Sequence, residues 1–136
     1  MKVIEKTILI IFLVSVCIVS GYAVDAEKED KKVVAEPMTL YFFYGKGCPV
    51  CKTIMPGVEA LPKEFPGLTV KTFEVWFNEE NRDMLIQMAR QRHTAARGVP
   101  TVVIGTKVYL GDSMAVIRKL VREHIQRIKS KPEQKD

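Results

Sequence analysis

Two short motifs, each joined to an apolar run, place the strongest constraint on how this chain can fold. The sequence Cys48-Pro49-Val50-Cys51 follows the apolar run Met38 to Tyr44, and Arg97-Gly98-Val99-Pro100-Thr101 precedes the run Val102 to Ile104. Two cysteines separated by two residues at a strand-to-helix junction can close a disulfide, with the second thiol buried and the first facing a partner. The partial positive charge of a helix N-terminus stabilises a thiolate placed there. The pairing predicts a dithiol exchange site whose nucleophile is Cys48.

The cysteines are unequal, which restricts the class of protein further. The chain of 136 residues contains three cysteines. Cys17 lies in an N-terminal apolar segment, whereas Cys48 and Cys51 share one motif. This distribution excludes a scaffold held together by several disulfides. The length fits one small domain with its own apolar core.

The N-terminus is typical of an export signal. Lys2 and Lys6 precede the apolar stretch Thr7 to Val19, and the small residues of Gly21-Tyr22-Ala23 suit cleavage after Ala23. An uncleaved membrane anchor is the alternative, because the apolar stretch reaches Val24 with only Ser, Gly and Tyr interruptions and is then just short of the length of a spanning helix. We therefore expect an extracytoplasmic protein, whether periplasmic, secreted or anchored with the domain facing outward. The expected divisions are a signal peptide or anchor at 1–23, a charged linker at 24–36, a domain at 37–129 and a charged tail at 130–136.

The rest of the chain alternates between strand and helix patterns. The apolar periodicity predicts an α/β domain in the order β-α-β-α-β-β-α. Asn78 is a candidate cap for the second helix, and Asp112 or Ser113 for the third. The expected strands are Met38 to Tyr44, Leu68 to Val75, Thr101 to Ile104 and Lys107 to Leu110, and the expected helices are Pro49 to Glu64, Glu79 to His93 and a last one reaching Ile128.

These motifs together resemble the thioredoxin superfamily over Met38 to Ile128. Besides the two cysteines, Pro56 lies five residues past the second cysteine, where the family has a proline in its active-site helix. A proline inside a helix removes a hydrogen bond and is uncommon without a reason. The segment Arg97 to Thr101 is similar to the family's cis-proline loop, and Gly111 to its late glycine. The resemblance implies a thioredoxin-like fold with a central mixed four-stranded sheet flanked by helices.

The resemblance also implies roles for individual residues. Cys48 would attack a substrate disulfide and Cys51 would resolve the mixed disulfide, or the same steps would run backward to oxidise a dithiol. A cis peptide bond would precede Pro100, which would keep a metal away from the dithiol. The main chain beside it would pair with an extended substrate segment. The implied substrate-binding residues are Gly98, Val99, Pro100 and Gly111.

The sequence also departs from the thioredoxin pattern near the expected site. Phe42 stands where thioredoxin has a buried aspartate, and Gly47 stands where it has a tryptophan. Glu74 is a candidate substitute acid/base group, with an exposed strand carboxylate as the plainer interpretation. Trp76 is expected to pack at the end of its strand, or else to help hold a substrate. Lys46 makes the surface around the site basic.

The favoured function is an exported thiol–disulfide oxidoreductase that acts on protein cysteines and exchanges electrons with a membrane redox partner. A glutaredoxin-like, glutathione-dependent reductase is an alternative, although Val50 replaces the tyrosine common in that dipeptide. A Cu(I)-binding module is a third, which Pro100 opposes. We expect a monomer with no cofactor, no bound metal and no nucleic-acid partner. The basic side chains near the C-terminus suit a solvated helix face or contact with anionic head groups.

Overall fold

The computed structural model describes residues 38–130. The segments expected at 1–23 and 24–36, and all but the first residue of the expected tail, lie outside the described residues. The order of elements is the predicted one, with strand and helix bounds close to those expected from the sequence. These are β1 (Thr39–Tyr44), α2 (Pro49–Glu64), β2 (Thr69–Glu74), α3 (Glu79–Arg90), β3 (Thr101–Ile104), β4 (Lys107–Leu110) and α4 (Met114–Ser130).

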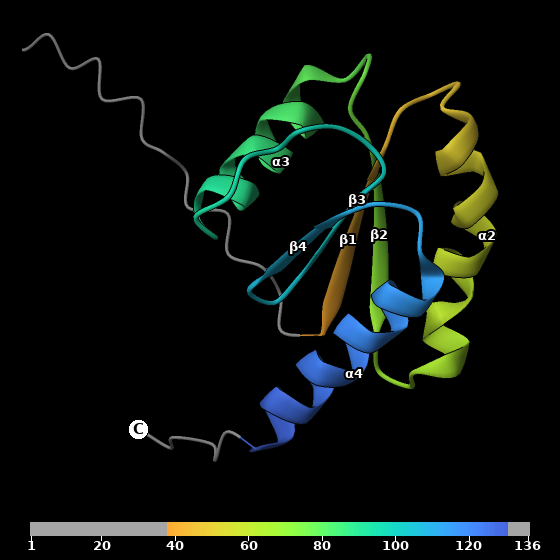
Figure 1. Ribbon diagram of the computed structural model, residues 1–136, viewed down its shortest axis with the longest axis vertical. Coiled ribbons are helices and arrows are strands. Elements are labelled where there is room, and N and C mark those ends of the chain that lie inside the picture. The colour runs from red at the N-terminus through yellow and green to blue at the C-terminus, as the bar shows by residue number, and fades with distance from the viewer. Residues whose placement is uncertain (1–37, 131–136) are drawn as a thin grey trace, which may run out of the picture. The chain divides into compact units, whose positions relative to one another are not determined.

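The strands form one mixed four-stranded sheet in the order β2-β1-β3-β4 (Figure 1). Strand β1 runs parallel to β2 and antiparallel to β3, and β3 pairs with β4 as an antiparallel hairpin. In this register Tyr44 lies opposite Glu74, and Phe43 lies opposite Thr101. The last residues of β1 and β2, the first of β3 and the last of β4 therefore share one edge of the sheet. This is the thioredoxin-like α/β fold that the resemblance implied.

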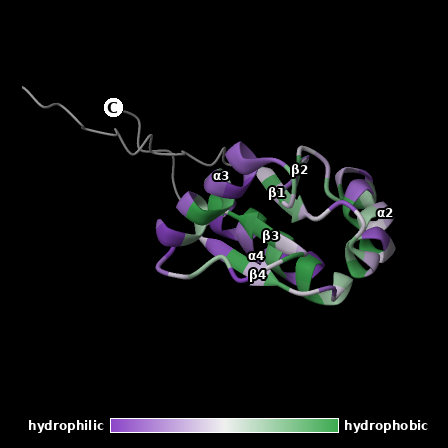
Figure 2. Cartoon of the chain, turned by 90° about the horizontal axis from the view of Figure 1, so that it is seen from above, coloured by the Kyte–Doolittle hydropathy of each residue, from purple (hydrophilic) through white to green (hydrophobic). Residues whose placement is uncertain are grey.

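Helices cover both faces of the sheet. Leu40 and Phe42 point toward α2 and α4, while Tyr41 and Phe43 point toward α3. All four side chains are buried, because β1 is a central strand with helices on both sides. Figure 2 shows β1 and β3 in hydrophobic colours, whereas the helices also carry hydrophilic stretches. The continuous apolar run in the sequence thus follows from burial on two faces.

The helix ends follow local capping chemistry. The side chain of Asn78 accepts a hydrogen bond from the Asn81 N–H at the start of α3, and the Ser113 hydroxyl accepts one from Val116 in α4. The prediction that α3 extends to His93 is wrong, since the helix ends at Arg90. The backbone of His93 has a φ of 55°, a left-handed conformation of the kind that commonly terminates helices.

Helix α4 is tied to α2 through its basic side chains. Arg118 donates two hydrogen bonds to the Glu64 carboxylate, at 2.8 and 2.9 Å. The hydrogen bond from Arg118 lowers the pKa of Glu64 below its usual value, against a smaller opposing effect of desolvation. The guanidinium of Arg122 lies 6.0 Å from the ring centroid of Phe65. Two of the basic residues considered for contact with lipid head groups thus take part in helix packing.

The part of the chain that the structure describes includes no helix long and apolar enough to cross a membrane.

Candidate active site

A tight turn leads from β1 to the first cysteine. The Cys48 N–H donates to the Gly45 carbonyl at 3.0 Å, which closes a four-residue turn. Gly47, at the third position, has a φ of 91°. A positive φ at that position is the mark of a type II turn and favours glycine. Gly47, which stands where thioredoxin has a tryptophan, therefore meets a backbone requirement of this turn.

Cys48 and Cys51 form a disulfide at the N-terminus of α2, with their Cα atoms 5.3 Å apart. Cys48 is the N-cap residue of the helix, and its sulfur accepts a hydrogen bond from the Cys51 N–H at 3.1 Å. Cys48 is 7% exposed and Cys51 1%. The first sulfur is thus less open than the sequence led us to expect, although it remains the more accessible of the two. When the pair is reduced, this amide and the helix dipole stabilise a thiolate on Cys48.

The loop before β3 reaches the same edge of the sheet. Pro100 is buried, and the peptide bond that precedes it is cis. Its carbonyl accepts a hydrogen bond from the Gly111 N–H at 3.1 Å, while the Thr101 hydroxyl donates to the Gly98 carbonyl at 2.6 Å. Gly111 has a φ of 152°, and a Cβ there would lie 2.6 Å from the Tyr109 hydroxyl. The structure therefore brings the loop residues and Gly111 together, and their role in binding substrate stays a prediction.

The Glu74 carboxylate accepts hydrogen bonds from four main-chain N–H groups. Its Oε1 accepts hydrogen bonds from the N–H groups of Lys46 and Trp76, at 3.1 and 2.8 Å. Its Oε2 accepts from Phe77 and Asn78, at 3.0 and 3.1 Å. Desolvation raises the pKa of Glu74, but these four main-chain donors outweigh it and leave the pKa below its usual value. The carboxylate is thus stabilised in its charged form, and its acid/base role stays a prediction.

Phe42 occupies the position at which thioredoxin has its buried aspartate. The side chain is completely buried in the cluster that includes Ile54 of α2. Its ring stacks with that of Tyr44, with centroids 6.2 Å apart. This position therefore supplies apolar packing in place of a proton acceptor.

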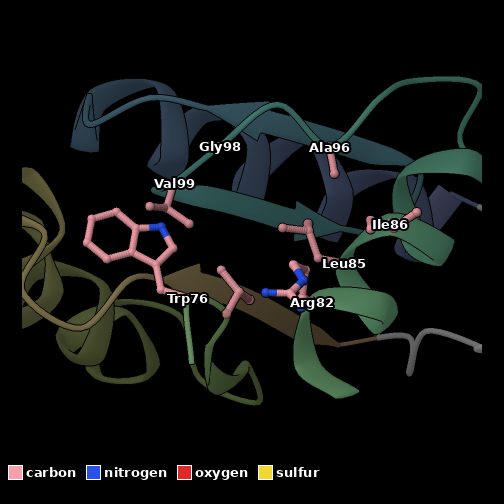
Figure 3. Close-up of a pocket in the computed structure, with 8 residues that line it drawn as sticks. Trp76, Arg82, Leu85, Ile86, Ala96, Gly98 and Val99 are labelled. Carbon is pink, nitrogen blue, oxygen red and sulfur yellow. The ribbon is translucent and has the colours of Figure 1, made fainter. Parts of the chain in front are cut away.

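A cavity of about 270 Å³ lies between α3 and the loop before Pro100. Trp76 forms one wall, and in Figure 3 its indole lies near Val99. The same indole covers the backbone of Gly45, because a Cβ on that glycine would overlap the ring. The cavity was not predicted, since its walls come from three separate segments of the sequence. Its lining residues are Val75, Trp76, Arg82, Leu85, Ile86, Ala96, Gly98 and Val99.

Within residues 38–130 there is no cluster of three or more histidine, cysteine, aspartate or glutamate side chains that could hold a metal ion.

The chain thus combines a thioredoxin-like fold with a Cys-x-x-Cys disulfide at a helix N-terminus. Two solved structures similar to it are thioredoxins. That of Fasciola hepatica is 24% identical, with a TM-score of 0.47 over 63% of this chain and 79% of the other. Thioredoxin 1 from the thermophilic eubacterium Thermosipho africanus TCF52B is 22% identical, with a TM-score of 0.48 over 69% of this chain and all of the other. No protein-family model and no curated protein matches the sequence.

Proposed function

We propose that this protein is a thiol–disulfide oxidoreductase that acts on cysteines of other proteins outside the cytoplasm. The observation that carries the proposal is the Cys48–Cys51 disulfide, with the sulfur of Cys48 at the N-cap of α2. This geometry favours the thiolate of the first cysteine over that of the second.

The exchange reaction needs no group beyond the two cysteines and the substrate. In the reducing direction the Cys48 thiolate attacks one sulfur of a substrate disulfide, and the other substrate sulfur leaves as a thiolate that takes up a proton. The Cys51 thiolate then attacks the Cys48 sulfur, which re-forms the internal disulfide and releases the second substrate thiol. Two electrons pass to the substrate, and the reverse sequence oxidises a substrate dithiol.

The surface around the dithiol favours a protein as the substrate. Within residues 38–130, four large apolar side chains are markedly exposed, and all belong to segments at the sheet edge that carries the disulfide. Clusters of exposed apolar residues are typical of protein contact sites. They are Val50 at 43% exposed, Trp76 at 49%, Phe77 at 79% and Leu110 at 47%.

A mixed-disulfide trap tests this function directly. In the full-length protein with Cys17→Ser and Cys51→Ser, the lone Cys48 thiol should form a stable adduct with insulin whose disulfides are intact, and Cys17→Ser with Cys48→Ser should form none. Cys17→Ser is the matched control and should reduce insulin like the wild type. Absence of an adduct in the variant with Cys51→Ser, together with no reduction of insulin by the reduced wild type, would contradict the proposal.

The direction of the reaction is set by the reduction potential of the pair, measured in glutathione buffers. A value near that of thioredoxin, about −270 mV, would make the protein a reductant, and one near about −120 mV a disulfide donor. Glutathione-dependent turnover would instead support the glutaredoxin-like alternative.

The proposed site of action rests on the sequence of residues 1–23. The pattern of charge and apolar residues there supports export, with cleavage after Ala23 or retention as an anchor. Fractionation of cells expressing the chain with a C-terminal tag tests both, because cleavage shortens the product and anchoring leaves it in the membrane fraction. Recovery of the tag in the cytosol alone would contradict export. Exchange with a membrane redox protein and a monomeric state remain predictions.

A further inference from the structure

The Glu74 carboxylate joins the two loops that form the site. One loop is the turn from β1 to Cys48, from which Lys46 donates its N–H. The other follows β2, and Trp76 and Phe77 donate their N–H groups from it. A hydrogen bond to a charged acceptor is stronger than one between neutral groups. One side chain thus holds both loops through main-chain atoms.

The bond to Lys46 fixes the approach to the nucleophile. Lys46 is the second residue of the turn that ends at Cys48, and Gly47, its third residue, is conformationally free unless the turn is held. The first turn residue, Gly45, lies under the indole of Trp76. The turn is therefore held at Lys46 by the carboxylate and at Gly45 by the indole.

The bond to Trp76 fixes a wall of the cavity. Trp76 is 49% exposed, so packing alone leaves much of the ring free to move. The main-chain N–H of Trp76 forms the shortest of the four hydrogen bonds to the Glu74 carboxylate, at 2.8 Å. The side chain of Asn81 also binds the Glu74 carbonyl at 2.9 Å, which joins the start of α3 to the same point.

We propose that Glu74 is a positioning residue that holds the turn before Cys48 and the indole of Trp76 in fixed relation, so that the dithiol and the cavity meet one substrate segment together. It acts through these two residues. The effect of Glu74 on disulfide exchange rests on the proposed function. Its effect on the position of Trp76 does not.

Trp76 is the only tryptophan of the chain, so fluorescence reports its position directly. Glu74→Gln keeps the size of the side chain but replaces one acceptor oxygen by an NH₂ group, which faces N–H donors. In the folded variant we expect emission at longer wavelength, as the indole leaves Gly45 for solvent. Glu80→Gln is the matched control, because Glu80 is an exposed carboxylate in the first turn of α3. It should leave emission unchanged.

Activity assays then separate positioning from general stability. For insulin we expect Glu74→Gln to raise KM and lower kcat/KM about tenfold, equivalent to about 1.4 kcal/mol. The rate with the small disulfide 5,5′-dithiobis(2-nitrobenzoic acid) should fall by a smaller factor than the rate with insulin, because that reagent needs the dithiol but not the cavity. Should this variant fail to fold, Glu74→Asp, which keeps the charge on a shorter side chain, is measured in the same way.

Two results would overturn the inference. Wild-type emission together with wild-type insulin kinetics would show that the carboxylate is not needed to hold either loop. Equal losses with insulin and with the small disulfide would place its effect on the dithiol itself. Failure of the wild type to exchange any disulfide would reject the proposed function instead, and the emission spectra would still decide whether Glu74 positions Trp76.

Discussion

Replacement of Gly45 by alanine should displace Trp76 without straining the backbone. A Cβ at this position would overlap the indole, while the φ of Gly45 lies outside the left-handed region, so the added methyl group is the whole perturbation. Trp76 is 49% exposed, which leaves about half of the ring buried. If a fully buried aromatic side chain covers about 200 Å², the buried half at about 25 cal/mol per Å² contributes about 2.5 kcal/mol. We therefore expect the free energy of unfolding to fall by up to about 2.5 kcal/mol.

Urea unfolding followed by far-ultraviolet circular dichroism measures this loss without relying on the fluorophore that moves. The emission of Trp76 in the folded variant should shift to longer wavelength in parallel. Gly98→Ala is the matched control for stability, because a Cβ there would meet only Leu110 Cδ1, at 4.0 Å. Wild-type stability and wild-type emission in Gly45→Ala would refute the close contact between the indole and this turn.

Three further predictions concern stability. Glu64 and Glu74 have folded-state pKa values below their ordinary value of about 4.5. Their contribution to the free energy of unfolding is therefore present above that pH and is lost as the pH falls through the folded values. The urea midpoints at pH 7 and pH 3 should differ less in Glu64→Gln than in the wild type, and an unchanged difference would contradict this. Gly57→Ala, inside α2, should raise the free energy of unfolding by up to about 1 kcal/mol if the flexible end of Met114, 3.2 Å from the new Cβ, gives way; a lower urea midpoint would show that it cannot. Phe42→Ala should cost about 3 to 5 kcal/mol, and a loss below about 1 kcal/mol would mean that the core collapses around the gap.

The secondary structure could be predicted because its signals are local. Alternation of apolar residues, the glycine turn between β3 and β4, and the capping side chain of Asn78 are each contained within a few neighbouring positions. The end of α3 was misjudged because the residues after Arg90, Gln91 to His93, include no glycine or proline to mark a stop, whereas the helix ends at Arg90 and His93 adopts a left-handed conformation. The end of this helix depends on the backbone conformation of one residue, which the amino-acid composition does not reveal.

The site was only partly predictable, because its second half depends on strand register. The motif of Cys48 and Cys51, taken together with the loop that ends at Pro100, predicted the dithiol pair, and the structure joins the two cysteines in a disulfide. The role of Glu74 depends on its place opposite Tyr44, which brings its carboxylate to the turn after β1. A shift of one residue would turn this side chain to the other face of the sheet. Pattern alone could suggest that Glu74 faced the site, but only the pairing shows which atoms it meets.

The parallel pairing of β1 and β2 brings two different loops to the same edge of the sheet. One strand leads to the Cys48–Cys51 pair, and its neighbour leads to the exposed side chains of Trp76 and Phe77. The two loops are separate in sequence and are joined by a carboxylate that binds main-chain atoms, which every residue other than proline can supply. The surface loop can therefore change its side chains, and with them the choice of partner, while the dithiol and its helix stay as they are.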